Sequence, residues 1–372
     1  MTRTLVARLD SMGDVLLAGP AVRAVAARAE VVMLCGPRGA EAAKLLPGVE
    51  EILVWDAPWA GFPPPPVTPD DVGRLLEAIA SAGIEEAVIL TSFHQSPLPL
   101  ALLLRLAGVR RITGASVDYP GALLDVRLRP GEDLPERLPE PVRALRIAAA
   151  AGYELPADDE GLLRLRPVPD PPAFLADAPY AVLHPGADAD ARRWPLERFA
   201  EAAALLEDAG LRPVVTGGPD EVGLTAAVAD GAAKAVDLGG ALALPDLAAV
   251  LAGADVLVAG NTGPAHLAAA VGTPIVSLFS PVVDAECWAP YGTRVSLLGD
   301  QSAPCRATRA RDCPIPGHPC LARVSAHAVV AEAERLRRVV RLAREDMAER
   351  AALAASLDCE APDASEPQEV HA

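Results

Sequence analysis

The stretch LVARLDSMGDVLLAGPAVRAV, residues 5–25, decides the fold. It begins with an apolar run of strand length, 5–9, and continues after a short polar turn as an alanine-rich pattern of helical period over about 14–28. Gly13 and Asp14 stand where the strand passes into the helix. A strand that leads directly into a helix is half of a βαβ unit, so the pattern predicts a parallel sheet.

Further units of the same kind follow in the first half of the chain. Apolar runs alternate with helical periodicity, which is typical of a parallel sheet covered by helices on both faces. The predicted strands are 31–35, 51–55 and 87–91, and the predicted helices are about 38–46 and 69–82. The proline-rich stretch 61–70 is predicted to be a surface loop, because proline suits neither a strand nor a helix interior.

A second proline-rich segment, 155–179, reads as a linker, and the alternation begins again after it. Further strands are predicted at 180–186, 211–218, 255–260 and 273–279, with helices at 194–210 and from Gly263. We therefore predict an α/β protein with two Rossmann-like, doubly wound domains that face a cleft. The predicted boundaries are 1–155 for the first domain, 156–179 for the linker, 180–324 for the second domain, 325–354 for a C-terminal helix and 355–372 for a disordered acidic tail.

Charge and hydropathy exclude several classes of partner. The chain of 372 residues has 50 acidic and 33 basic residues and a formal net charge of −17, so no global field attracts nucleic acid. The pattern contains neither a secretory leader nor an apolar run that spans a bilayer, so we expect a cytosolic protein. Peripheral contact with a membrane is compatible with that expectation.

The stretch NTGPAHLAAAVGTP, 261–274, has the composition of a phosphate-binding turn. A strand ends in glycine, and Asn261, Thr262 and Gly263 then lead into a helix of small residues. Free backbone N–H groups, a hydroxyl and the positive end of a helix together bind phosphate without a metal. An ordinary capped helix with Pro264 in its first turn explains the pattern equally well, and His266 reads either as a ligand or as a packed residue.

Arg192 and Arg193, in HPGADADARRWPLERF (184–199), supply positive charge after another predicted strand. A guanidinium binds phosphate oxygens in pairs, whereas a solvated basic pair is the simpler alternative. The neighbouring Asp188 and Asp190 resemble an acidic pair that holds a divalent ion, although we expect no metal there. Cys305, Cys313 and Cys320 cluster with His318 in a spacing that fits no standard zinc motif, so reduced thiols are expected, with a metal site or a disulfide as the alternatives.

Four motifs taken together resemble glycosyltransferase family 9, the ADP-heptose:lipopolysaccharide heptosyltransferases. They are GDVLLAGP near the start, HPGA with RRWPLERFAEAA, TGGPDE, and NTGPAHLAAAVGTPIVSLF, in the order of the family. The resemblance implies a GT-B fold, with an acceptor-binding first domain and a nucleotide-sugar-binding second domain. It also implies an inverting, metal-independent transfer without a cofactor, in which the donor is a nucleotide sugar such as ADP-heptose and the acceptor a glycan, lipid-linked or small molecule.

The resemblance also assigns roles to individual positions. Asp14 matches the catalytic acidic residue, and Arg192 matches a basic residue that is more often lysine. Asn261 stands where the family usually has aspartate, which leaves the exact donor open. The other donor-binding positions are Thr262, Gly263, His266, Asp220 with Glu221 as its rival, Leu242, Leu244, Gly186 and Arg193, and the acceptor side is Gly13, Ser11, His94 and Gln95.

The expected mechanism follows from where charge develops. Arg192, Thr262 and the helix start at Gly263 would stabilise the departing nucleoside diphosphate, and Asp14 would accept the proton of the attacking hydroxyl. Two other classes stay open. A dinucleotide-dependent oxidoreductase shares the βαβ pattern but would need G-x-G-x-x-G after the first strand, and a nucleotide-sugar-binding protein without activity would lack the base that Asp14 supplies.

Overall fold

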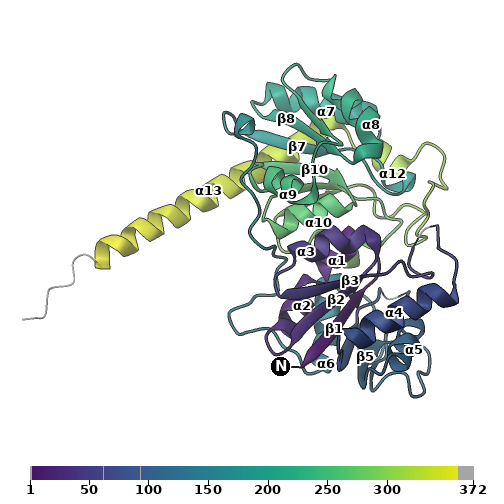
Figure 1. Cartoon of the computed structure of the whole chain (residues 1–372). Coiled ribbons are helices and arrows are strands. Elements are labelled where there is room, and N and C mark those ends of the chain that lie inside the picture. The colour runs from purple at the N-terminus through teal and green to yellow at the C-terminus, as the bar shows by residue number, and fades with distance from the viewer. Residues whose placement is uncertain (1, 62, 93, 359–372) are drawn as a thin grey trace, which may run out of the picture.

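The computed structural model describes residues 2–61, 63–92 and 94–358, with the backbone alone for 344–358. The chain forms two lobes, each built on a six-stranded parallel sheet (Figure 1). The first sheet has the order β3-β2-β1-β4-β5-β6 and the second has the order β12-β11-β10-β7-β8-β9. Both orders describe the same doubly wound topology, in which the first strand of each half lies at the centre, so the predicted fold class is confirmed.

The strands form where β-branched and other apolar residues follow one another without alternating polar residues. Such continuous apolar runs are expected for strands that are buried on both faces. In the first lobe they are β1 Arg3–Arg8, β2 Glu30–Cys35, β3 Val49–Val54, β4 Glu86–Ile89, β5 Arg111–Ala115 and β6 Val126–Leu128. In the second lobe they are β7 Tyr180–His184, β8 Arg212–Gly217, β9 Val236–Gly239, β10 Val256–Gly260, β11 Ile275–Leu278 and β12 Val295–Leu298. The sequence pattern did not place β5, β6, β9 and β12.

Helices cover both faces of each sheet. The first lobe contains α1 Met12–Leu17, α2 Gly19–Ala26, α3 Ala40–Leu45, α4 Pro69–Ser81, α5 Leu98–Leu106 and α6 Glu140–Ala150. The second contains α7 Leu196–Asp208, α8 Val222–Ala229, α9 Leu244–Ala252, α10 Gly263–Ala270, α11 Ala285–Trp288 and α12 Pro319–Ala322, with short 3₁₀ turns η3 Asp190–Arg192 and η4 Pro219–Glu221. None of the helices in the described part of the chain combines the length and the apolar character needed to cross a membrane.

The helix predicted over about 14–28 is in fact two helices, α1 and α2, which meet at Ala18 and Gly19. Pro20 stands in the first turn of α2 and has no N–H to continue the hydrogen bonds of α1. The periodic pattern runs through this break because alanine and valine fill both helices. The short helix α1 therefore places Ser11 and Asp14 in its own first turn at the end of β1.

The two lobes meet through the first turns of α1 and α10, and α13 leaves the second lobe (Figure 1). Gly13 and Gly263 permit this approach, because a Cβ added at Gly13 would lie 2.9 Å from His266 Cδ2 and 3.4 Å from Gly263 Cα. The linker is anchored to the first lobe, since Arg23 Nε donates to Asp159 Oδ2 over 2.6 Å. Helix α13 spans Ala326–Asp358, so it continues past the predicted end at 354; of the predicted tail, 359–372 lies outside the described residues.

Candidate functional site

A cleft of about 550 Å³ lies between the carboxyl ends of the two sheets. Its walls come from the loops after β1, β2 and β4 in the first lobe and from those after β7, β8, β9, β10, β11 and β12 in the second. In each sheet the central pair of strands, β1 with β4 and β7 with β10, is the point where the strand order reverses, and ligands of doubly wound sheets bind outside such points. The volume suits a nucleotide-sized ligand.

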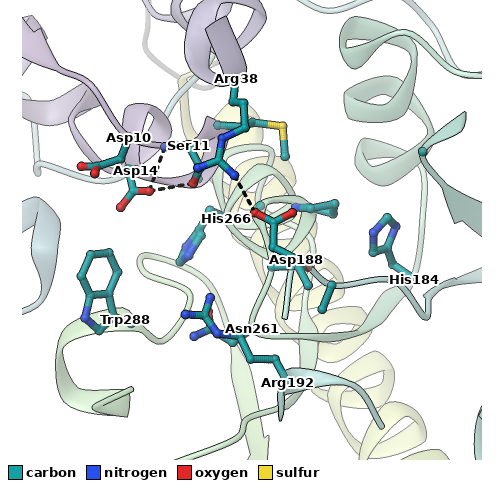
Figure 2. A pocket seen from close by; sticks show the side chains of 18 of the residues that line it. Asp10, Ser11, Asp14, Arg38, His184, Asp188, Arg192, Asn261, His266 and Trp288 are labelled. Atoms are coloured by element: carbon teal, nitrogen blue, oxygen red, sulfur yellow. Dashed lines mark hydrogen bonds and ion pairs between the residues drawn. The ribbon is translucent and has the colours of Figure 1, made fainter. Parts of the chain in front are cut away.

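Most of the residues predicted for the site line this one cleft. Asp14 from the first lobe and Arg192 from the second both face it, and His266 lies between them in the view of Figure 2. The other predicted residues that line the cleft are Ser11, Gly13, His94, Gly186, Glu221, Leu242, Leu244, Asn261, Thr262 and Gly263. Segments from six different loops are therefore brought together by the fold.

Asp14 belongs to a buried network of charges centred on Arg8. Arg8, which is 3% exposed, lies at the end of β1, and its Nη2 donates to Asp14 Oδ1 over 2.8 Å. Its Nε pairs with Asp10 Oδ2 at 2.9 Å and its Nη1 with Glu140 Oε2 at 3.0 Å. Ser11 completes the shell of Asp14, because its backbone N–H and its hydroxyl both donate to Asp14 Oδ2, over 3.1 and 2.6 Å (Figure 2).

This network shifts the pKa values of Asp14 and Asp10 in opposite directions. Burial by itself would raise the pKa of Asp14, but the Arg8 guanidinium and the two Ser11 hydrogen bonds outweigh it, and the pKa is lowered. Burial dominates at Asp10 and raises its pKa against the attraction of Arg8. Asp14 is thus held in its ionised form where it lines the cleft.

The turn after β10 leaves polar groups without partners. The side chain of Thr262 stands at the N-cap of α10 but makes no capping hydrogen bond. Among the described residues, Thr262 Oγ1, His266 Nδ1 and Arg192 Nε are buried atoms without a hydrogen-bond partner. Burial lowers the pKa of His266 to about 4, so this ring is neutral at pH 7. Buried polar atoms that are left unpaired at a helix start indicate a site built for an anionic ligand.

Asp220 and Glu221 are neighbours in the 3₁₀ turn η4, but only one of them faces the cleft. Glu221 lines the cleft, accepts from the Gly218 N–H over 2.8 Å through Oε2, and lies 3.9 Å from His184 Nε2. Asp220 is exposed and does not line the cleft. Gly186 makes room for Glu221, because a Cβ at position 186 would lie 1.9 Å from Glu221 Oε1. Of the two acidic residues considered for this position, the structure therefore brings Glu221 into the site and leaves Asp220 outside it.

Two other predicted residues point elsewhere. Arg193 Nη2 donates to the Ala187 carbonyl over 2.9 Å and Nη1 pairs with Asp190 at 2.7 Å, so it braces the loop behind Arg192. The Gln95 amide donates to Asp10, and Gln95 Oε1 accepts from the Ser92 N–H over 3.3 Å. Neither residue lines the cleft, and both support residues that do.

The two aspartates weighed as metal ligands are each paired with an arginine. Asp188 Oδ2 accepts from Arg38 Nη1 over 3.1 Å across the cleft (Figure 2), and Asp190 is held by Arg193. Cys305, Cys313 and Cys320 are free thiols, and Cys305 and Cys320 pack in the core of the second lobe. No group of three or more His, Cys, Asp or Glu side chains within the described ranges is arranged to hold a metal ion.

Sequence reasoning missed several residues of the cleft. Arg8 and Asp10 carried a usable signal, because charged residues directly follow the apolar run that leads to Asp14. Glu140 carried none, since it lies on α6 and meets Arg8 only in the fold. Other residues of the cleft that the sequence argument missed include Arg38, Trp288 and Arg309.

Two facing Rossmann-like domains with a ligand cleft between them define the GT-B fold. The same fold occurs in E. coli ADP-heptose lipopolysaccharide heptosyltransferase II, with a TM-score of 0.69, 18% identity and coverage of 92% of this chain and 100% of that one. E. coli heptosyltransferase WaaC with ADP matches with a TM-score of 0.66, 22% identity and coverage of 90% and 100%. These likenesses establish the fold.

Residues 146–318 match the model of glycosyltransferase family 9 (heptosyltransferase). E. coli lipopolysaccharide heptosyltransferase 3 is 31% identical over 120 residues, which cover 31% of this chain and 35% of that protein. The matched region thus spans about a third of the length of such curated relatives. Over residues 146–318 the chain is therefore similar to glycosyltransferase family 9 (heptosyltransferase).

Proposed function

We propose that this protein is an inverting, metal-independent glycosyltransferase that transfers a heptose from ADP-heptose to a hydroxyl of a glycan or lipid-linked acceptor. One observation carries the proposal: a half-buried, ionised carboxylate, Asp14, and a set of unpaired anion-binding groups face each other across one cleft. A hydroxyl nucleophile needs a carboxylate that accepts its proton, and a departing diphosphate needs groups that bind its negative charge.

The second lobe would bind the donor. Arg192, the Thr262 hydroxyl and the N-terminus of α10 would hold the diphosphate, and Glu221 would accept hydrogen bonds from the ribose hydroxyls. Leu242 and Leu244, at the start of α9, offer an apolar wall for the base. Similar folds have been solved with ADP and with ADP-2-deoxy-2-fluoro heptose, which supports an adenine nucleotide as the donor.

The first lobe would bind the acceptor near Ser11, Gly13 and His94. The acceptor oxygen attacks the anomeric carbon, the bond from that carbon to the β-phosphate oxygen breaks, and the hydroxyl proton passes to Asp14. Because the pKa of Asp14 is lowered, it is a weak base, and the proton leaves only once the developing bond has made the hydroxyl acidic. Attack from the face opposite the leaving group inverts the anomeric centre.

Nucleotide binding tests the proposal through thermal stability. ADP should raise the melting temperature more than GDP, UDP or TDP, because ligand binding stabilises the native state by mass action. Arg192→Ala should remove most of the ADP shift, whereas Arg198→Ala, an exposed arginine paired with Glu201 on α7, should leave it intact. Equal shifts in the wild type and Arg192→Ala would remove Arg192 from the donor site, and binding without sugar transfer would favour an inactive nucleotide-sugar-binding protein.

A further inference from the structure

Arg309 lies on the loop between β12 and α12, the segment that carries Cys305 and Cys313, and its side chain lines the cleft. Its backbone adopts φ 59°, a left-handed conformation that costs energy for any residue other than glycine. Two hydrogen bonds hold this part of the loop, from the Ala307 N–H to the Pro281 carbonyl over 2.9 Å and from the Arg309 N–H to the Val282 carbonyl over 2.8 Å.

The loop is also joined to the segment that carries Arg192. The Ala191 N–H donates to the Arg311 carbonyl over 2.8 Å, and Arg311 Nη2 donates to the Asp188 carbonyl over 2.7 Å. Cys305 and Cys320, which are 2% and 3% exposed, anchor the two ends of the loop in the core of the second lobe. Arg309 is therefore held at a definite place beside the donor side of the cleft.

The charges around Arg309 point to an anion. After burial, the largest influence on its pKa is the positive charge of Arg192, and the pKa is lowered. Burial also lowers the pKa of Arg192. An anion that enters the cleft between Arg309 and Arg192 would be attracted by both guanidinium groups. The carboxylates that act on Arg309 include Asp10 and Asp14, so Arg309 is within electrostatic reach of the proposed base as well as of Arg192.

We propose that Arg309 is a second donor-binding cation, which binds the β-phosphate of the nucleoside diphosphate together with Arg192. The inference rests on the proposed function. The β-phosphate carries the sugar, so it must lie at the end of the diphosphate nearer to Asp14, and Arg309 is within electrostatic reach of Asp14. The strained backbone and the mutual repulsion of the two arginines are the cost of holding a cation where negative charge develops.

Calorimetric titration with AMP and ADP separates the β-phosphate from the rest of the nucleotide. Arg309→Ala should weaken ADP binding by about 10- to 100-fold, the effect of losing a charged hydrogen bond, and should leave AMP binding nearly unchanged. Arg309→Lys should retain part of the ADP affinity because it keeps the charge. Arg306→Ala, an exposed position on the same loop and outside the cleft lining, is the matched control and should bind ADP like the wild type.

Arg309→Gly separates a binding role from a structural one. Glycine adopts the left-handed backbone without strain and removes the repulsion with Arg192, so the melting temperature of the ligand-free protein should stay level or rise while the ADP shift shrinks. Unchanged ADP affinity in Arg309→Ala overturns the inference, as does equal weakening of AMP and ADP, or a raised KM for the acceptor alone. If the wild type binds ADP, these results leave the proposed function standing; if it binds no nucleoside diphosphate, both fall.

Discussion

Asp14 illustrates how a single side chain acquires its chemistry from its neighbours. In the first turn of α1 it closes a capping box with Ser11, which by itself would explain an aspartate at this position. The buried Arg8 adds a charge that no capping role requires, and it holds Asp10, Asp14 and Glu140 around one guanidinium. The carboxylate is thereby fixed in one orientation and kept ionised.

The base role of Asp14 is tested by Asp14→Asn. The amide oxygen of asparagine can still accept a hydrogen bond from Arg8 or from the Ser11 N–H, so the fold and ADP binding should persist. Turnover should fall by about 100- to 10,000-fold, because the amide cannot take a proton from the acceptor. The measurement is steady-state sugar transfer alongside ADP titration.

Asp10→Asn is the matched variant, since Asp10 shares Arg8 and lines the same cleft. We expect a smaller loss of turnover, because the Asp10 carboxylate is already held by Arg8 and by the Gln95 amide. If Asp14→Asn transfers sugar at the wild-type rate while Asp10→Asn is inactive, the base is Asp10.

His266 predicts a pH dependence of stability. Its pKa is lowered by burial from 6.5 to about 4, so the native state resists a proton that the unfolded chain binds below pH 6.5. The stabilisation is therefore complete above pH 6.5 and is lost as the pH falls toward 4, at about 1.4 kcal/mol per pH unit for this one group. Denaturant unfolding of the wild type and His266→Gln at a series of pH values measures the difference in slope.

His327→Gln provides the control for that series. The side chain of His327 on α13 is 75% exposed, so its contact with water changes far less on unfolding than that of His266. Its slope should match that of the wild type. Identical slopes for His266→Gln and the wild type would show that His266 takes up a proton in the folded protein as easily as in the unfolded chain.

At the scale of elements, the meeting of α1 and α10 governs the geometry of the cleft. Each helix begins directly after a central strand, so the first turns of both lie at the reversal points of their sheets. Gly13 and Gly263 allow the two turns to approach closely. The proposed base and the proposed diphosphate site are thus positioned by one packing contact.

Gly13→Ala tests that contact. The added methyl group would lie 2.9 Å from His266 Cδ2, too close for a carbon, so the turns must move apart. We expect transfer to slow by about 10- to 100-fold through misplacement, with melting temperature lowered. Gly73→Ala on α4, where nothing lies within 4 Å of the new methyl, should keep full activity and be slightly more stable. Full activity in Gly13→Ala would show that the approach of the helices is not needed.

At the scale of the whole molecule, sugar transfer can proceed without a metal ion only if protein groups neutralise the charge of the leaving diphosphate. Sugar transfer should persist in excess EDTA, because Arg192 and the start of α10 supply the positive charge that a metal provides in other enzymes. Loss of transfer that magnesium or manganese restores would make Asp188 and Asp190 ligands after all. Asp188→Asn in the same assay separates two causes of a loss of transfer. A loss that comes from breaking the ion pair between Asp188 and Arg38 does not depend on added metal, whereas a loss of metal binding does.

Local sequence determined the strand-to-helix units and the position of polar residues at the ends of strands. Periodicity acts over a few residues, so it places Asp14, Arg192 and the turn at Thr262 on the correct loops and predicts a doubly wound fold. It does not register a break such as the one between α1 and α2, where apolar residues continue on both sides of Gly19 and Pro20.

Only the tertiary structure decided which of these residues share a site and with which partners. Glu140 meets Arg8 because α6 packs beside the first sheet, and Arg309 enters the cleft because its loop is tied to the segment around Arg192. The choice between Asp220 and Glu221 depends on the direction that η4 gives each side chain. Such contacts join positions far apart in sequence, and their geometry depends on how helices and sheets pack, which no local pattern encodes.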